Sequence, residues 1–112
     1  NELCKVVGAA FAMAYISYFE GFGIPIIEAM QCEVPVITSN VTSMPEVAGD
    51  AALLIDPFSV DSIAEGMLKV LKDAAVRKDL IEKARLRKNV FTWDRTANLT
   101  WNAIEKTLEQ CR

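Results

Sequence analysis

Short runs of apolar residues constrain the fold of this chain more than any other feature of its sequence. Such runs, at residues 9–16, 34–39 and 52–55, alternate with segments in which apolar residues recur at helical spacing. A strand without a polar face is typical of a parallel sheet that helices cover on both sides. The alternation therefore predicts an α/β domain with a Rossmann-like, three-layer parallel sheet of about three strands and right-handed crossovers.

Helices are predicted before, between and after these strands. They span residues 2–8, residues 24–32, a short turn at 44–47 opened by Ser43, a segment capped by Ser59 or Asp61, residues 75–90, and a last segment capped by Thr92. For the helix after Ser59 or Asp61, the predicted inward stripe is Val60, Ile63, Ala64, Met67, Leu68 and Leu71. For the helix at 75–90 it is Val76, Leu80, Ile81 and Ala84.

The last helix is also predicted to be amphipathic. Its apolar residues at helical spacing are Ala97, Trp101, Ile104, Leu108 and Cys111. We expect Trp93 and Trp101 to pack against the protein and not to stack on a ligand. Tyr18 and Phe19 are the aromatic residues that we expect beside a ligand.

Composition limits what the chain can be. Its 112 residues suffice for one domain, and we treat 1–112 as a single partial domain, with βα units at 1–57 and helices at 58–112. A net charge of −3 argues against a nucleic-acid partner. Three cysteines without C-x-x-C spacing argue against a zinc site or a disulfide framework and favour a reducing cytoplasm. The chain has no histidine, so this piece lacks the usual proton shuttle near neutral pH. No apolar run approaches the length of a membrane span.

A loop rich in glycine leads into the second helix at residues 20–29, EGFGIPIIEA. Gly21 and Gly23 let another molecule approach the main chain closely, and Pro25 suits the first turn of a helix. The start of that helix offers unpaired N–H groups and a partial positive charge, which suit a phosphate. In a parallel sheet this loop falls at the carboxyl end of a strand, where such folds bind ligands.

Carboxylates stand on both sides of this loop. Glu28 lies roughly 6 Å into the helix at 1.5 Å per residue, where it can accept hydrogen bonds from a ribose diol beside a phosphate. Glu20 precedes the turn and can accept hydrogen bonds from a second polyol. The alternative is purely structural: a tight loop caps a buried helix, and Glu28 is favourable near the positive helix end.

Together these residues resemble the family 4 glycosyltransferases, retaining enzymes with the two-domain GT-B fold. Glu20 and Glu28 match the family's signature of two glutamates separated by seven residues. Further matches follow in order at Cys32, Val34-Pro35-Val36-Ile37, Ser39-Asn40, Pro45-Glu46-Val47, Gly49-Asp50-Ala51-Ala52, Asp56-Pro57 and Phe91-Thr92-Trp93-Asp94-Arg95-Thr96. The similarity covers essentially the whole chain, which resembles the second half of the family's donor-binding C-terminal domain.

The resemblance implies roles for the loop. Glu20, the candidate catalytic residue, would contact hydroxyls of the transferred sugar, and Glu28 would bind the ribose of the nucleotide. Main-chain N–H groups would face the sugar and the diphosphate, and would stabilise the charge that the leaving diphosphate gains. The implied substrate-binding residues are Glu20, Gly21, Phe22, Gly23, Ile24 and Glu28. The implied partners are a nucleotide-sugar donor and a sugar, glycan or lipid acceptor, with no metal or other cofactor.

The chain departs from the family pattern in two respects. Glu33 stands where the family often has glycine, a residue that suits a left-handed helix cap. The glycine-rich strand and the basic pair that open the family's C-terminal domain are not among these residues, and neither is the acceptor-binding N-terminal domain. We therefore expect a piece of a longer enzyme that is inactive by itself, with an uncovered sheet edge through which it pairs into a dimer.

Other interpretations stay open. A noncatalytic α/β module that binds a nucleotide or a partner chain is the main alternative, whereas sugar-nucleotide epimerases of similar two-domain fold generally rely on other residues. Basic residues on the predicted late helices fit either a solvated surface or a cytoplasmic enzyme attached to the inner membrane, as in some relatives. These residues are Arg77, Lys78, Lys83, Arg85, Arg87, Lys88 and Arg95.

Overall fold

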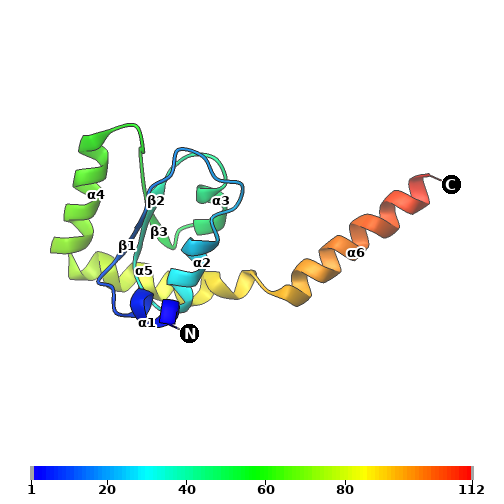
Figure 1. Ribbon diagram of the computed structural model, residues 1–112, viewed down its shortest axis with the longest axis horizontal. Coiled ribbons are helices and arrows are strands. Elements are labelled where there is room, and N and C mark those ends of the chain that lie inside the picture. Colours follow the sequence, from blue (N-terminus) through cyan, green and yellow to red (C-terminus); the bar gives the residue numbers. More distant parts are fainter. Residues whose placement is uncertain (1, 112) are drawn as a thin grey trace.

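A three-stranded parallel sheet forms the centre of the structure, a computed structural model that describes residues 2–111 (Figure 1). The strands β1 (Met13–Tyr15), β2 (Val36–Ser39) and β3 (Ala52–Ile55) lie in the order β1-β2-β3. Tyr15 lies opposite Thr38, and Ser39 lies opposite Ile55. The predicted α/β fold class is confirmed. Asn1 and Arg112, the ends of the predicted domain range, lie outside the described residues.

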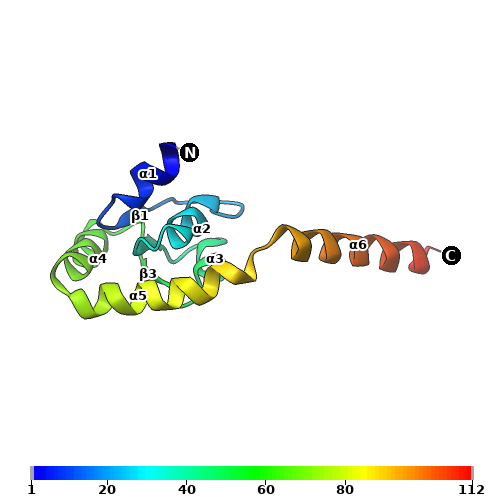
Figure 2. The same cartoon turned by 90° about the horizontal axis from the view of Figure 1, so that it is seen from below.

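Helices cover both faces of the sheet, which gives the three predicted layers (Figures 1 and 2). α2 (Ile24–Gln31) and α3 (Met44–Ala48) pack on one face, and α4 (Val60–Lys72) packs on the other. α5 (Ala74–Arg87) runs along the end of the sheet opposite the loop at residues 17–23. The short α1 (Glu2–Gly8) precedes the sheet and contacts α2.

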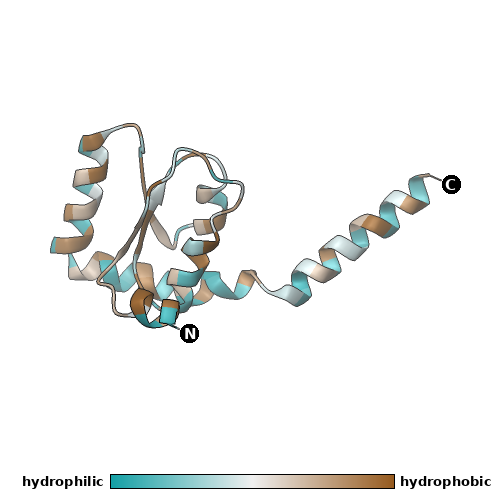
Figure 3. Ribbon diagram, viewed as in Figure 1, coloured by the Kyte–Doolittle hydropathy of each residue, from teal (hydrophilic) through white to brown (hydrophobic). Residues whose placement is uncertain are grey.

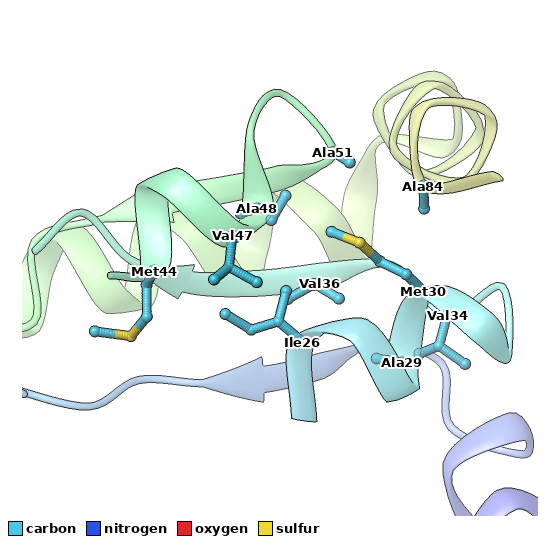
Figure 4. Packing of buried hydrophobic residues seen from close by; sticks show 11 residues of the cluster. Ile26, Ala29, Met30, Val34, Val36, Met44, Val47, Ala48, Ala51 and Ala84 are labelled. Carbon is cyan, nitrogen blue, oxygen red and sulfur yellow. The ribbon is translucent and has the colours of Figure 1, made fainter. Parts of the chain in front are cut away.

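Alternating residues of β2 enter two separate hydrophobic clusters. Val36 packs with Ile26 and Met30 in the layer between the sheet and the helices α2 and α3, as Figure 4 shows. Ile37, the next residue, packs on the other face with a cluster that includes Val70 of α4. Complete burial of a side chain of this size contributes about 1.5–3 kcal/mol. A strand that is buried on both faces is the reason why this run of sequence has no polar face.

The first strand is shorter and less buried than predicted. Only Met13–Tyr15 of the run at 9–16 is a strand, and residues 9–12 form a turn and a bend. Ala14 is exposed because β1 lies at the edge of the sheet and pairs only with β2 among the described residues. The prediction of a strand buried on both faces is therefore wrong for β1. Pairing of this edge with another chain stays a prediction, to be checked by sedimentation over a range of concentrations.

The inward face of α4 also differs from the predicted stripe. Ser59 is the N-cap, and its Oγ accepts from Ser62 N. Of the predicted stripe, Ile63 is half-buried and packs against the cluster that contains Val70. The fully buried residues are Gly66 and Val70, while Val60, Ala64, Met67, Leu68 and Leu71 are exposed. The helix approaches the sheet through Gly66: a Cβ there would lie 2.6 Å from Ile55 Cγ2. Met67 and Leu71 line a hollow with Ala14 of β1 and Ile37 of β2, so they lie on the sheet side of α4 but stay exposed beside the edge strand.

α5 confirms its predicted inward residues, with Leu80 and Ala84 buried and Val76 and Ile81 half-buried. Its Asp73 cap accepts from Ala75 N at 2.9 Å and Val76 N at 3.1 Å. It ends three residues earlier than predicted, because η1 (Lys88–Val90) is a 3₁₀ turn. Glu33, after α2, adopts a left-handed φ of 58° without being glycine, and its carboxylate pairs with Arg85 at 2.6 Å.

The last helix, α6 (Trp93–Gln110), projects away from the rest of the molecule (Figure 1). Thr92 caps it as predicted, since Thr92 Oγ1 accepts from Arg95 N at 3.2 Å. Its apolar bands lie open along its length (Figure 3). Trp93 is 89% exposed and Trp101 is 60% exposed. The expectation that these tryptophans pack is wrong within residues 2–111, because no described element lies alongside α6. Within that range, no helix combines the length and apolar character that a bilayer crossing requires.

Candidate functional site

The loop at residues 17–23 lies at the carboxyl end of β1 and leads directly into α2, as predicted. Gly23 is the N-cap of α2 with a φ of 100°, and Pro25 occupies the first turn. A Cβ on Gly23 would lie 3.1 Å from Ile26 Cδ1, so both the backbone angle and the available space favour glycine. The predicted binding residues from Glu20 to Ile24 therefore form one continuous bend over the start of a helix.

Glu20 is half-buried, and neighbouring hydroxyl groups hold its carboxylate. Ser17 Oγ donates to Glu20 Oε1 at 2.8 Å. The hydrogen bond from the Tyr15 hydroxyl lowers the pKa of Glu20 below its ordinary value, and the bond from Ser17 lowers it further. The bond with Glu20 raises the pKa of Tyr15, and burial of the hydroxyl raises it further. Glu20 is thus an ionised acceptor at neutral pH, and a carboxylate has further lone pairs with which to bind substrate hydroxyls.

Tyr15→Phe should shift the acid limb of any activity that needs ionised Glu20. The substitution removes the donor that most lowers the pKa of Glu20, so that pKa rises and the carboxylate becomes protonated at a higher pH. The acid midpoint of the kcat/KM profile should therefore move upward in the full-length protein, with a smaller upward shift for Ser17→Ala. An unchanged or lower midpoint in Tyr15→Phe would contradict this assignment.

The N–H groups at the start of α2 are available to a ligand. Those of Phe22, Gly23 and Ile24 have no acceptor among residues 2–111. The carbonyl groups of Glu20 and Phe22, in contrast, both lie within hydrogen-bonding distance of Ser43 Oγ. The bend therefore binds to the protein through carbonyls and leaves successive donors free, an arrangement suited to an anion.

Glu28 lies one turn further along α2, on the same face as the exposed Ile24. It is half-buried, and within the described part of the chain its carboxylate makes no hydrogen bond or ion pair. The structure thus brings the two signature glutamates into one loop–helix unit. Their roles toward a substrate stay predictions.

A groove of about 550 Å³ opens beside the loop, between α3 and the start of α6. Of the predicted site residues, Gly21 and Phe22 line it. The Phe22 ring meets the Phe91 ring edge-on, with centroids 5.7 Å apart. Arg87 lies over Phe91 and donates from Nε to Val47 O at 3.0 Å and from Nη2 to Glu46 O. Phe91, which belongs to the last matched motif, therefore supports the loop from 69 positions away.

Tyr18 and Phe19 are exposed on the loop, where we expected a ligand-facing position. Tyr18 stacks on Phe58, which follows β3, with ring centroids 5.0 Å apart. No cluster of three or more metal-binding side chains occurs within residues 2–111.

Sequence reasoning missed the residues that support the loop: Tyr15, Ser17, Thr42, Ser43 and Phe91. A signal for part of this set was present in segment 38–43, which contains Thr38, Ser39, Thr42 and Ser43. Because the carboxyl ends of neighbouring parallel strands share one edge of the sheet, these hydroxyl groups had to lie near the loop after β1. The Phe22–Phe91 contact had no such signal.

Comparison with known proteins decides the family. The chain matches the glycosyl transferases group 1 over residues 1–87. It belongs to this family. It is 43% identical over 105 residues to the Escherichia coli O-antigen chain mannosyltransferase B, an alignment that covers 94% of this chain and 28% of that protein. With an E. coli serotype-specific mannosyltransferase, WbdA, it shares 34% identity over 111 residues, which cover 99% of this chain and 13% of WbdA.

A solved structure agrees with this family membership. Sucrose-phosphate synthase from Thermosynechococcus elongatus superposes with a TM-score of 0.77 at 28% identity, over 99% of this chain and 28% of that one. The predicted resemblance to the C-terminal portion of a family 4, GT-B glycosyltransferase is confirmed. This chain spans less than a third of the length of each of these three proteins.

Proposed function

We propose that this chain supplies part of the donor site of a retaining glycosyltransferase that uses a nucleotide-activated hexose. The observation that carries the proposal is the single bend that joins an ionised carboxylate, Glu20, to free N–H groups at the start of α2. Glu20 accepts hydrogen bonds from hydroxyls of the transferred sugar. The N–H groups of Phe22, Gly23 and Ile24 face the sugar and the diphosphate, and Glu28 binds the ribose.

In the proposed reaction an acceptor oxygen forms a bond to the anomeric carbon on the face from which the diphosphate departs. The bond between that carbon and the phosphate oxygen breaks, and the phosphate takes the acceptor's proton. This route needs no histidine, and the chain contains none. Fixed N–H donors at the helix start stabilise the negative charge that develops on the leaving diphosphate, because they need no reorientation during the reaction.

The relatives narrow the proposed donor. Both E. coli proteins described above are named as mannosyltransferases, so we propose mannose as the transferred sugar and a growing glycan as the acceptor. We further propose that a longer protein, with an acceptor-binding N-terminal domain, completes the site, since this chain spans only 28% of the first relative. The free cysteines Cys4, Cys32 and Cys111 suit the reducing cytoplasm.

The structure supports membrane attachment through the basic residues of the late helices less well than it supports the donor site, because most of these residues already have partners within the protein. Arg77 donates to the carbonyls that end α4, Arg85 pairs with Glu33, and Arg87 donates to the end of α3. Lys78 and Lys83 pair with acidic residues one turn away. These contacts favour a structural role for the basic face over binding to anionic lipid.

Calorimetric titration of the full-length protein with UDP, GDP and ADP tests the proposal. One nucleotide should bind, and Glu28→Ala should weaken it by roughly 10–100-fold, the effect of losing a hydrogen bond to a charged group. Glu65→Ala, which removes an exposed carboxylate from α4, is the matched control and should bind normally. Binding by none of the nucleotides, or equal binding by Glu28→Ala, would contradict the proposed ribose contact. Glu28-dependent binding without turnover of any nucleotide sugar would instead support the noncatalytic module.

A further inference from the structure

Hydroxyl side chains of one segment, residues 38–43, hold the main chain that leads into and through the Glu20 loop. Thr38 Oγ1 donates to Tyr15 O at 2.7 Å, and Ser39 Oγ donates to Ser17 O at 2.7 Å. Thr42 and Ser43 continue this series along the loop. The loop lies outside the regular helix and strand ladders, so these side chains replace the backbone hydrogen bonds that it lacks.

Ser43 makes the central contacts. Its Oγ lies 2.8 Å from Glu20 O and 3.0 Å from Phe22 O, so one hydroxyl faces the carbonyls on both sides of Gly21. Thr42 Oγ1 accepts from Glu20 N at 3.3 Å. The main-chain N–H and C=O of Glu20 are thus both bonded by this adjacent pair of residues.

These bonds orient the groups that face the proposed donor. In a trans peptide the C=O and the following N–H point in opposite directions. A Phe22 carbonyl held toward Ser43 therefore turns the Gly23 N–H away from Ser43, and that N–H has no acceptor among the described residues. The same hydroxyl also restrains the backbone from which the Glu20 side chain extends.

Ser43 holds the loop instead of serving as a conventional cap. It occupies the N-cap position of α3, where serine normally accepts from an N–H of the first turn, but its side chain makes no such bond. The preceding Thr42 has a φ of 54°, a conformation that is unfavourable for a β-branched residue. Neither feature serves α3, and both accompany the contacts to the loop.

We propose that Ser43, together with Thr42, is a positioning residue for glycosyl transfer: its hydroxyl fixes the bend so that Glu20 and the Gly23 N–H hold the orientation that the transition state requires. The proposal rests on the proposed function. It concerns how the loop is held, and it gives Ser43 no direct contact with the substrate.

Steady-state kinetics of the full-length enzyme with a nucleotide-mannose donor provide the first test. Ser43→Ala should lower kcat about tenfold, the effect expected from losing one to two hydrogen bonds, with a smaller change in the KM of the donor. Ser43→Thr keeps the hydroxyl and should recover most of the rate. The matched control is Thr107→Ala, which removes a hydroxyl that donates to a main-chain carbonyl, Ala103 O, on α6 and far from the loop, and which should leave kcat unchanged. Equal kcat values for Ser43→Ala and Thr107→Ala would overturn the proposal.

A double-mutant cycle with Glu20→Ala separates positioning from a general structural effect. If Ser43 acts through the loop, Ser43→Ala should reduce kcat much less in the Glu20→Ala background than in the wild-type enzyme. A full, additive effect in both backgrounds would show that the hydroxyl acts elsewhere and would overturn the proposal.

Chymotrypsin cleavage tests the same contact without any activity. The loop carries Tyr18, Phe19 and Phe22, all exposed, and cleavage after them requires local opening of the chain. Ser43→Ala should speed cleavage within residues 18–22 several-fold, whereas Thr107→Ala should not. Faster cleavage in a protein that transfers no sugar would mean that the proposed function fails while the loop contact stands. Unchanged cleavage would overturn the role of Ser43 itself.

Discussion

Glu20→Ala should lower the kcat/KM of the full-length enzyme for its nucleotide sugar by about 100-fold or more, the effect of losing one to two hydrogen bonds to a charged acceptor. The reason is that Glu20 is held ionised by Tyr15 and Ser17 and is proposed to bind hydroxyls of the sugar while the glycosidic bond breaks. Transfer of labelled mannose from the donor to the acceptor measures the change.

Two further variants separate the effect of the Glu20 charge from that of losing any surface carboxylate. Glu20→Gln keeps the shape of the side chain and removes its charge, so its rate should lie between those of the wild type and Glu20→Ala. Glu65→Ala removes an exposed carboxylate of α4 and should retain full activity. A Glu20→Ala enzyme with a wild-type rate would remove the basis for assigning Glu20 to catalysis.

Gly49→Ala should lower the free energy of unfolding by about 2–4 kcal/mol, the combined effect of backbone strain and a steric clash. Gly49, which follows α3, has φ 57° and ψ −129°, a conformation that a residue with a Cβ rarely adopts. A Cβ there would lie 3.1 Å from Arg87 Nε and 3.3 Å from Arg87 Cζ. Arg87 would have to move, and its bonds to the end of α3 and its contact with Phe91 would weaken.

Urea denaturation of the purified protein measures this effect. Gly21→Ala is the control, because a Cβ on Gly21 would meet nothing within 4 Å and its φ is not in the left-handed region. That variant should be as stable as the wild type, or more stable by about 0.4–1 kcal/mol through a smaller entropy of the unfolded chain. Equal midpoints and slopes for Gly49→Ala and the wild type would show that the turn after α3 tolerates a side chain.

Local sequence predicted the parts of the fold that neighbouring residues decide. The caps at Ser59 and Thr92, the helix after Gly23, and β3 at Ala52–Ile55 all follow from side chains within a few positions of each element. The loop with Glu20 was found for the same reason, since glycine, proline and the two glutamates are adjacent in the chain. The alternation of apolar runs with helical segments predicted the α/β fold class, and the family resemblance added the GT-B fold; the comparisons confirm both.

The errors arose where the position of an element depends on distant residues. Periodicity placed Met67 and Leu71 on the buried face of α4, but both lie beside the edge strand β1 and stay exposed, whereas Gly66 and Val70 are buried. The run at 9–16 was predicted as a long buried strand, whereas β1 lies at a sheet edge and only Met13–Tyr15 pairs. Hydropathy alone reports that a residue is apolar and does not identify the surface that covers it.

For the candidate site the division is similar. The sequence by itself determined which residues form the bend and which helix begins there, because glycine conformation and helix starts are properties of a few consecutive residues. Only the tertiary structure decided what holds that bend: Ser43 on the carbonyls of Glu20 and Phe22, and Phe91 against the Phe22 ring. Those contacts join residues 21 to 69 positions apart. The Ser43 contacts exist only once the parallel strands bring their carboxyl ends to one edge of the sheet, and the Phe91 contact exists only once α5 has packed on the domain.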